Sequence, residues 1–288
     1  MDILTFILLI IVGLVLGSFL NVVIFRKGTG LSLGGRSMCF SCGKTLAWYE
    51  LIPLISFMIQ GGKCRSCKAK LSWQYPIVEG LAAAGFTWLG YLWLIDGGLS
   101  WIHLGFFVLS SSVCFSLLAI ASYDLRHMII PDSFSFWFTL SSLALVGLSY
   151  LSFRIDALSF GRIMDGKTAI MFIATGIVFA FVFFLVWLLS RGKWIGFGDA
   201  KLVLGIGFFL GPVGGVSAIV YAFWVGALYA IFHMIRSAVR VRRGRSALSH
   251  EVPFAPFLIV GIIIAYIVPV DLMRVSFIID YVTQVFFS

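Results

Sequence analysis

Charged residues, and acidic ones above all, are scarce in this sequence. Only 11% of the 288 residues are Asp, Glu, Lys or Arg, and only 12 are acidic. A soluble globular domain usually carries roughly 25% charged residues, so the composition excludes an ordinary water-soluble protein. In their place, 61% of the residues are hydrophobic. Apolar runs recur at the length of about 20 residues that a helix needs to cross a bilayer. The sequence therefore predicts an all-α polytopic membrane protein.

Several familiar signatures are also missing. The four histidines are scattered and no G-x-S-x-G occurs, which argues against a Ser-His-Asp hydrolase. No glycine-rich nucleotide fingerprint follows a predicted strand. The first apolar run has no basic segment before it and no small-residue cleavage site after it. We therefore expect a retained helix rather than a cleaved signal peptide.

The apolar runs predict about eight transmembrane helices, with glycine-rich breaks between several of them. Their expected ranges are 3–25, 76–95, 101–123, 133–152, 168–189, 200–211, 214–235 and 254–270. The expected domains are a first transmembrane helix, a soluble insert, a seven-helix membrane domain and a C-terminal tail, at 1–25, 26–75, 76–270 and 271–288. The run 200–211 is the least regular, because it is short and broken by glycines.

Basic residues gather in alternate loops. Of the 21 Lys and Arg residues, 17 lie in one set of loops and only 4 lie in the other. The rich set comprises 26–75, 124–132, 190–201 and 236–253. The positive-inside rule places this set in the cytoplasm and both termini outside. The net charge of +9 thus follows from membrane topology, and we expect no nucleic-acid partner.

The soluble insert holds two C-x2-C pairs, Cys39–Cys42 and Cys64–Cys67. Their separation is close to that of a four-cysteine zinc ribbon, in which each pair supplies two thiolates to one tetrahedral ion. Nearby glycines suit the tight turns of such a site. Four protein ligands leave no position for water, so the predicted ion is structural. A redox pair and unligated cysteines are the alternatives.

Two aspartates stand at the ends of apolar runs. Asp199 lies in Gly196-Phe-Gly198-Asp199-Ala-Lys201, and Asp124 directly follows the run 101–123. Ionisable groups at membrane depth are costly and are functional candidates by default. We expect the glycine pair to let the backbone turn or unwind near Asp199. Two carboxylates on one leaflet can share a proton, as aspartic proteases require.

Other acidic residues have simpler interpretations. Asp132 follows Pro131, where it is suited to cap the next helix, and Asp124 itself could be a helix-end residue paired with Arg126. Glu79 lies one turn into the second predicted helix. An ion- or proton-coupled transporter using Glu79, Asp124 and Asp199 is therefore an alternative to an enzyme, although no convincing internal repeat supports it. A non-catalytic scaffold with a zinc module is a third possibility.

The chain resembles the type IV prepilin peptidases, which are GxGD membrane aspartic proteases. Motifs of that family recur in order over almost the whole length: Gly17-Ser-Phe-Leu-Asn-Val-Val-Ile-Phe-Arg26, the two cysteine pairs, Tyr75-Pro-Ile-Val-Glu79, Asp124, Pro131-Asp132, Gly196-x-Gly-Asp199-x-Lys201-Leu202 and Pro253-Phe-Ala-Pro-Phe257. Two departures occur: Ala255 replaces a usual glycine, and Lys27-Gly28 replaces a usual Leu-Pro.

The resemblance implies a function. It implies cleavage of the basic leader of type IV prepilins or type II secretion pseudopilins, after a glycine, at the cytoplasmic face of the bacterial inner membrane. Asp124 and Asp199 would be catalytic, with Gly196, Gly198, Lys201, Asp132 and Glu79 in support. The resemblance also implies zinc at the four cysteines, a cluster that in this family goes with the cytoplasmic domain and methyltransferase activity. It implies N-methylation of the new terminus with S-adenosylmethionine, whose binding residues it does not identify. A peptidase without methyltransferase activity stays open.

Overall fold

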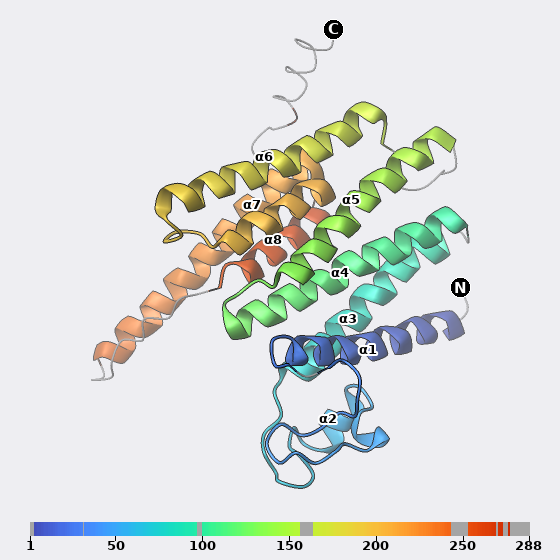
Figure 1. Cartoon of the computed structure of the whole chain (residues 1–288), viewed down its shortest axis with the longest axis vertical. Coiled ribbons are helices and arrows are strands. Elements are labelled where there is room, and N and C mark those ends of the chain that lie inside the picture. The colour runs from blue at the N-terminus through green and yellow to red at the C-terminus, as the bar shows by residue number, and fades with distance from the viewer. Residues whose placement is uncertain are drawn as a thin grey trace. The chain divides into compact units, whose positions relative to one another are not determined.

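The computed structural model describes residues 3–30, 32–96, 100–155, 164–242, 253–268, 270–272 and 276. The described residues are mainly helical, and their only β pairing is two isolated bridges in the cysteine insert. The predicted all-α membrane fold is confirmed. Contacts divide the chain into two compact units, the first ending at Ser122 and the second running from Tyr123 onward. Figure 1 shows both units.

The first unit is built on helices α1 (Ile3–Arg26) and α3 (Gln74–Gly90), and it includes most of α4 (Trp101–His127). Helices α1 and α3 approach closely at Gly13 and Gly17. A Cβ atom there would lie 2.7 Å and 2.9 Å from Cα atoms of α3, those of Ala83 and Glu79 respectively. Small residues four apart allow this backbone contact, which is a common way for membrane helices to associate.

The insert between α1 and α3 contains little regular structure. It has one turn of 3₁₀-helix (η1, Trp48–Glu50) and one short helix, α2 (Ile55–Ile59). At its other end, α3 runs into a π-helical turn (η2, Tyr91–Asp96). Trp93 of this turn stacks on Phe106 of α4 with ring centroids 4.6 Å apart, which ties α3 to α4 within the first unit.

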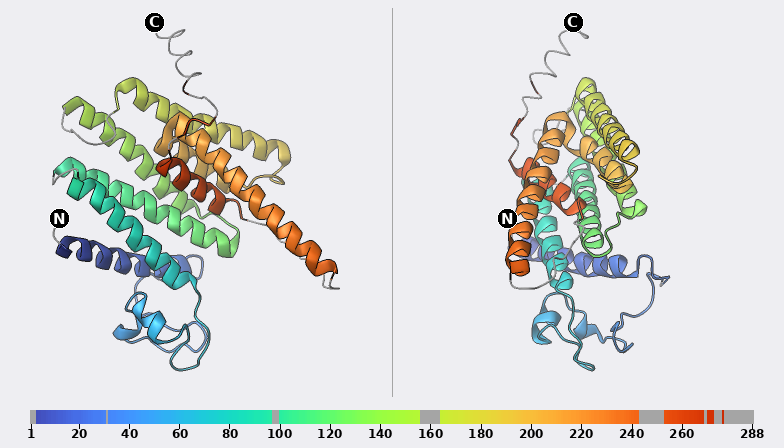
Figure 2. Two further views of the ribbon diagram at one scale, coloured as in Figure 1. Left: turned by 180° about the vertical axis from the view of Figure 1, so that it is seen from behind. Right: turned by 90° about the vertical axis from the view of Figure 1, so that its left-hand side faces the viewer.

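The second unit comprises the end of α4, α5 (Asp132–Ile155), α6 (Gly166–Ser190), α7 (Phe197–Arg242) and α8 (Ala255–Ile267). Helix α7 packs against α5, α6 and α8. Its C-terminal part extends past α8, as Figure 2 shows in orange. Glycines again set the closest approaches: a Cβ atom on Gly207 would collide with Gly176 of α6, and one on Gly261 of α8 with the Ala218 carbonyl.

Helix α7 contains a break that the sequence indicated. Gly211 has φ 68° and ψ −167°, which is not helical backbone, and Pro212 follows it. The expected runs 200–211 and 214–235 are therefore the two parts of α7. Among the described residues, six helices are long and apolar enough to cross a membrane, with α7 counted once. Helix α8 has only 13 residues. The prediction of about eight spans counts the two parts of α7 separately and adds α8.

The outer helices expose apolar side chains rather than polar ones. In α1, only 17% of the most apolar 18-residue segment is buried inside the protein, and the buried share in α6 is the same. Both segments are strongly hydrophobic. Exposed leucine, isoleucine and phenylalanine side chains run along these helices. Such an apolar surface is unfavourable in water and favourable in hydrocarbon. A helix can lie in hydrocarbon because its backbone N–H and C=O groups are hydrogen-bonded to one another.

Candidate functional site

Asp124 lies in the last turn of α4, which the structure extends to His127 rather than ending at residue 123. Its side chain is buried, with the residue 4% exposed. The backbone N–H of Ala255, the first residue of α8, donates a hydrogen bond to its carboxylate. A negative charge in a last turn opposes the helix dipole. Capping its own helix therefore does not explain this aspartate.

Asp199 lies in the first turn of α7 and is also buried, at 7% exposed. The Gly196 N–H donates to its Oδ2 atom at 3.2 Å, and the Asp199 N–H donates to the Gly196 carbonyl at 3.1 Å. This reciprocal pair resembles a capping box and fixes the carboxylate at the helix N-terminus. Of the turn or unwinding expected here, no unwinding is seen: neither Gly196 nor Gly198 has a positive φ, and α7 begins between them.

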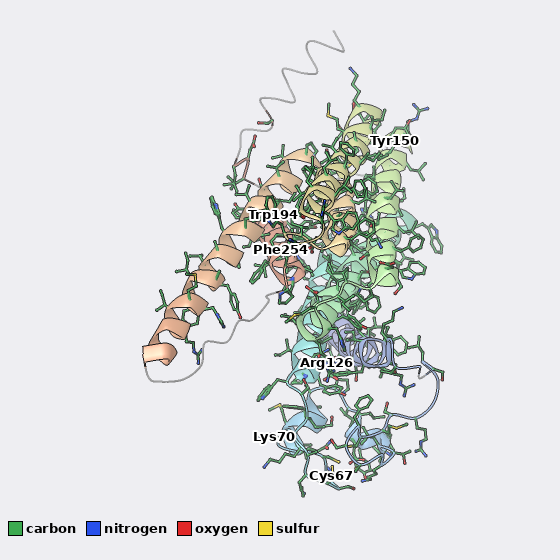
Figure 3. The ribbon with its side chains drawn as sticks, turned by 60° about the vertical axis from the view of Figure 1, so that its left-hand side comes forward. Cys67, Lys70, Arg126, Tyr150, Trp194 and Phe254 are labelled. Carbon is green, nitrogen blue, oxygen red and sulfur yellow. The ribbon has the colours of Figure 1, made fainter. Side chains whose placement is uncertain are left out.

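The structure brings the two aspartates together within the second unit. Asp124 lies close enough to Asp199 for the two carboxylates to interact electrostatically. Among the described residues, no lysine, arginine or histidine forms an ion pair with either carboxylate, so the proposed partnership of Asp124 with Arg126 is not formed. Figure 3 labels Arg126 and Phe254, which mark the chain beside Asp124 and before α8. The result is two buried carboxylates without a cationic partner.

Two contacts hold the α4–α5 connection against the first turn of α7. Lys201 Nζ lies 2.6 Å from Asp132 Oδ1, and it also lies 4.6 Å from the ring centre of Phe197. Gly198 precedes Asp199 in the sequence, and a Cβ atom on it would come within 2.9 Å of the Ile130 Cβ atom. The second motif glycine is thus required by close packing. These contacts keep the end of α4, and so Asp124, beside Asp199.

Glu79 lies in the first unit, whereas both aspartates lie in the second. It is 5% exposed, and its Oε2 atom accepts a hydrogen bond of 2.8 Å from the Leu54 backbone N–H. Ser18 of α1 also bonds to its carboxylate. Glu79 therefore joins α1, the insert and α3.

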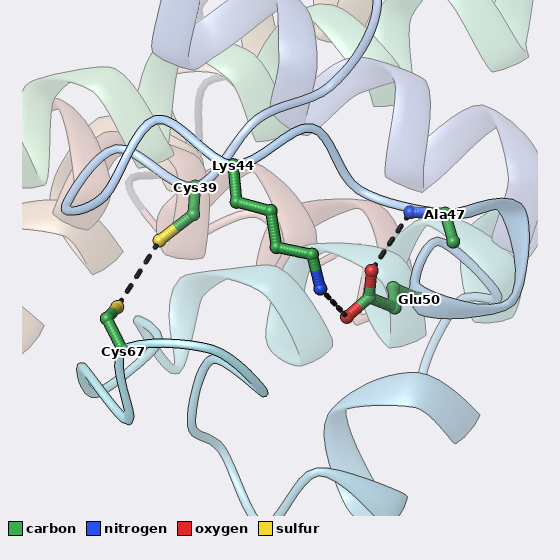
Figure 4. A network of polar contacts seen from close by, with 5 residues as sticks. All are labelled: Cys39, Lys44, Ala47, Glu50 and Cys67. Carbon is green, nitrogen blue, oxygen red and sulfur yellow. Dashed lines mark hydrogen bonds and ion pairs between the residues drawn. The ribbon is translucent and has the colours of Figure 1, made fainter.

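The four cysteines of the insert form one cluster. Their sulfur atoms all lie within 4.8 Å of one another and could hold a metal ion. Four sulfurs at about 2.3 Å from one tetrahedral ion stand about 3.8 Å apart. The Cys39 and Cys67 sulfurs, drawn in Figure 4, are 3.9 Å apart. The donor set and the spacing fit a zinc-type ion.

Two matching turns present these cysteines. The Cys39 N–H donates to the Lys44 carbonyl and the Cys64 N–H to the Ala69 carbonyl, each at 2.9 Å. The residue after the second cysteine of each pair is left-handed, with φ 70° at Gly43 and 59° at Lys68. The expected glycine turns are confirmed at Gly43, and the equivalent turn at Lys68 had no sequence signal.

Backbone groups tune the thiols unequally. The N–H groups of Cys67 and Ser66 lower the pKa of the Cys64 thiol to about 7. The Ala69 N–H acts in the same direction on Cys67, but burial and the neighbouring Cys42 and Cys64 sulfurs outweigh it and raise that pKa to about 11. Four thiolates at this distance repel one another, so the metal-free cluster retains protons that a bound cation would displace.

Comparison with known proteins adds two family matches. Residues 11–93 match the bacterial peptidase A24 N-terminal domain, and residues 111–231 match the type IV leader peptidase family. The first range contains all four clustered cysteines, and the second contains both buried aspartates. No solved structure matches the chain.

Curated relatives cover nearly the whole chain. A prepilin leader peptidase/N-methyltransferase of Bacillus subtilis is 33% identical over 90% of this chain and 93% of its own length. A protein of the same name from Vibrio cholerae is 29% identical over 90% and 95%. A type 4 prepilin-like proteins leader peptide-processing enzyme of Escherichia coli is 30% identical over 86% and 88%. The chain therefore belongs to the type IV leader peptidase family.

Proposed function

We propose that this protein is a membrane aspartic endopeptidase that removes the basic leader of type IV prepilins or type II secretion pseudopilins and then methylates the new N-terminus. The observation that supports the peptidase is the pair Asp124 and Asp199, both buried and, among the described residues, in no ion pair with a cation. Family membership supports the substrate class and the enzyme class. It does not favour the transporter or the non-catalytic scaffold.

The pair can carry out peptide hydrolysis by sharing one proton. The ionised carboxylate takes a proton from a water molecule, whose oxygen attacks the scissile carbonyl carbon, while the protonated carboxyl group donates to the carbonyl oxygen. Collapse of the tetrahedral intermediate breaks the C–N bond, and a proton goes to the leaving amine. The Ala255 N–H and the Gly196 N–H hold the two carboxylates in place during these steps.

The charge distribution supports an orientation. The basic loops flank both the cysteine insert and the two aspartates, which supports a cytoplasmic position for both and a position outside for the termini. A prepilin could then lay its hydrophobic helix in the lipid beside the enzyme while its leader stays in the cytoplasm. The scissile bond would lie at the level of Asp124 and Asp199.

Two further groups belong to the proposal. One structural zinc ion would be held by Cys39, Cys42, Cys64 and Cys67, whose sulfurs fit a tetrahedral site. S-adenosylmethionine would supply the activated methyl group for N-methylation, as the names of the relatives indicate for those proteins.

Neutralising either aspartate tests the peptidase. Asp124→Asn and Asp199→Asn remove the shared proton site with almost no change of shape. Each should slow cleavage of a tagged prepilin in membranes by roughly 100- to 10,000-fold. Cleavage is measured by the shift of the substrate on a gel, and the mature N-terminus by mass spectrometry, which also records methylation.

Asp165→Asn is the matched control, because it removes a carboxylate that only caps α6. Its cleavage rate should equal that of the wild type. A normal rate with either Asp124→Asn or Asp199→Asn, at equal amounts in the membrane, would rule out the pair. Cleaved but unmethylated product from the wild type would leave a peptidase without methyltransferase activity.

A further inference from the structure

A cavity of about 480 Å³ lies within the first unit, enclosed by α1, the cysteine insert and the start of α3. This volume falls in the range of roughly 300 to 1,000 Å³ that small-molecule sites occupy. Cys39 and Cys64 line it, so the metal cluster forms part of its wall. All residues that line it precede residue 80 and belong to the first unit. Neither catalytic aspartate takes part.

Two buried carboxylates line this cavity, and their partners differ. Glu50, whose side chain is 1% exposed, accepts from the Ala47 N–H at 2.9 Å and lies 3.8 Å from Lys44 Nζ, as Figure 4 shows. Glu79 is bonded only to neutral groups, and among the described residues no cation lies within ion-pair distance of it. A buried carboxylate without a counter-charge is costly. The cavity therefore favours a cationic ligand.

The two arginines that line the cavity do not neutralise Glu79. Arg26 donates to the carbonyls of Ser32 and Gly34 at 2.7 Å, and to two further carbonyls of the same loop. Its guanidinium is committed to folding that loop over the end of α1. Arg36 is exposed to solvent. Of the two glutamates that line the cavity, Glu50 already has Lys44 as a partner, so Glu79 is the carboxylate available to a cationic ligand.

Aromatic rings form much of the remaining wall. Phe25 stacks on Tyr75 with ring centroids 4.7 Å apart and an angle of 19°, and the ring of Phe40 lies 5.8 Å from that of Phe25. All three line the cavity, together with Phe57 and Phe19. Aromatic faces stack with purine rings and attract ligand cations such as sulfonium and quaternary ammonium groups.

We propose that this cavity is the binding site for S-adenosylmethionine, with Glu79 facing its positive charge and the Phe25–Phe40–Tyr75 wall receiving its adenine. This molecule combines a purine with a net positive charge, and the cavity offers aromatic faces to the first and a buried carboxylate to the second. The inference rests on the proposed methylation but locates it in the first unit. It separates the cofactor from the peptidase aspartates.

The test measures cofactor binding rather than methylation. The full-length protein in detergent, with its metal, is titrated calorimetrically with S-adenosylmethionine and with S-adenosylhomocysteine, whose sulfur is neutral. Glu79→Gln keeps an acceptor for the Leu54 N–H and removes only the charge. It should weaken binding of the cationic cofactor on the order of tenfold and leave binding of the neutral analogue nearly unchanged.

A second variant fills the space without touching the charge. Ser56 lies on α2 and lines the cavity, so Ser56→Trp should abolish binding of both ligands while prepilin cleavage and metal content stay normal. Asp165→Asn, in the other unit, should bind both as the wild type does. Ultraviolet cross-linking of radiolabelled cofactor should label peptides within residues 15–79.

The outcomes separate the inference from the function it rests on. The proposed location would be overturned if neither Glu79→Gln nor Ser56→Trp changed cofactor binding, or if the cross-links lay only in the second unit. The proposed methyltransferase activity would not be affected by either result. No binding to a wild-type protein that still cleaves prepilin would overturn both the location and the proposed methylation, but not the peptidase.

Discussion

Gly198 leaves no room for a side chain beside Asp199. A Cβ atom there would stand 2.9 Å from the Ile130 Cβ atom and 3.3 Å from its Cδ1 atom. Gly198→Ala must therefore push the α4–α5 connection away from α7, and the two carboxylates with it. Because a displacement of about 1 Å can lower a rate roughly 100-fold, we expect a loss of that size in prepilin cleavage.

Gly196→Ala is the matched control, because its Cβ atom would meet only Asp199 Oδ2 at an ordinary 3.4 Å. It should keep most of the activity. Ile130→Gly, introduced into the Gly198→Ala chain, should restore part of the rate by making space. Equal activity of the two alanine variants would show that the first motif glycine matters as much as the second and that packing is not the reason.

At the scale of single residues, the sequence identified Asp124 and Asp199 but not the groups that contact them. Asp124 and Asp199 stand out because carboxylates are rare beside apolar runs. The Ala255 N–H that bonds Asp124 is a backbone group that every residue except proline carries. Ile130 is one isoleucine among many. Such partners become visible only when distant segments are packed together.

Helix α6 begins with a charged cap. Asp165 accepts a hydrogen bond of 3.0 Å from the Thr168 N–H. Bonds from the side chain and then the backbone of Thr168 hold the pKa of this carboxyl group below its ordinary value. The resulting stability is fully present above the unfolded-state pKa of about 3.9. It is lost as the pH falls through the lower folded-state pKa.

Asp165→Ala should lower the melting temperature of the protein in detergent by a few degrees at pH 7, where the cap is ionised. The difference from the wild type should shrink below pH 4. Asp165→Asn should melt close to the wild type, since asparagine caps equally well, and should lose the pH dependence in that window. A difference between alanine and wild type that stays constant from pH 7 to pH 3 would exclude a charged cap.

Helix boundaries were predicted less well than helix existence. The apolar runs identified every long helix, because hydrocarbon requires a continuous apolar segment of fixed length. They ended α4 at residue 123, since three of the four residues that follow, Asp124, Arg126 and His127, are polar and look like a loop. The structure continues the helix to His127 and stops it at Met128, which has φ 53°. Polar residues in a last turn carry no periodic signal, so the true position of Asp124 within α4 was hidden.

The two candidate sites lie in two different compact units of the chain. The cysteine cluster and the cavity lie in the first, and the aspartate pair lies in the second. The families matched by the two parts divide the chain in nearly the same way. The sequence indicated both sites, but not the cavity, because its walls come from α1, the insert and α3, and only folding encloses a space between them.

Metal removal should therefore affect the two sites unequally. A chelator, or the double change Cys39→Ser and Cys64→Ser, would remove the ion that cross-links the two cysteine turns in the cavity wall. Binding of S-adenosylmethionine should fall at least tenfold, while cleavage of prepilin falls far less. Metal content is followed by mass spectrometry and binding by calorimetry. Full loss of cleavage with intact cofactor binding would reverse this assignment and tie the ion to the peptidase.

The shortness of α8 has a consequence for the backbone beside Asp124. At 13 residues, this helix is about 20 Å long, whereas the hydrocarbon layer is about 30 Å thick. Both of its ends cannot reach the two surfaces of an undeformed bilayer. Its first residue, Ala255, is the one that bonds Asp124. Backbone that stops being helical at such depth must be wetted or enclosed by protein. Ala255 is fully buried, so at this end of α8 protein rather than lipid encloses the backbone beside Asp124.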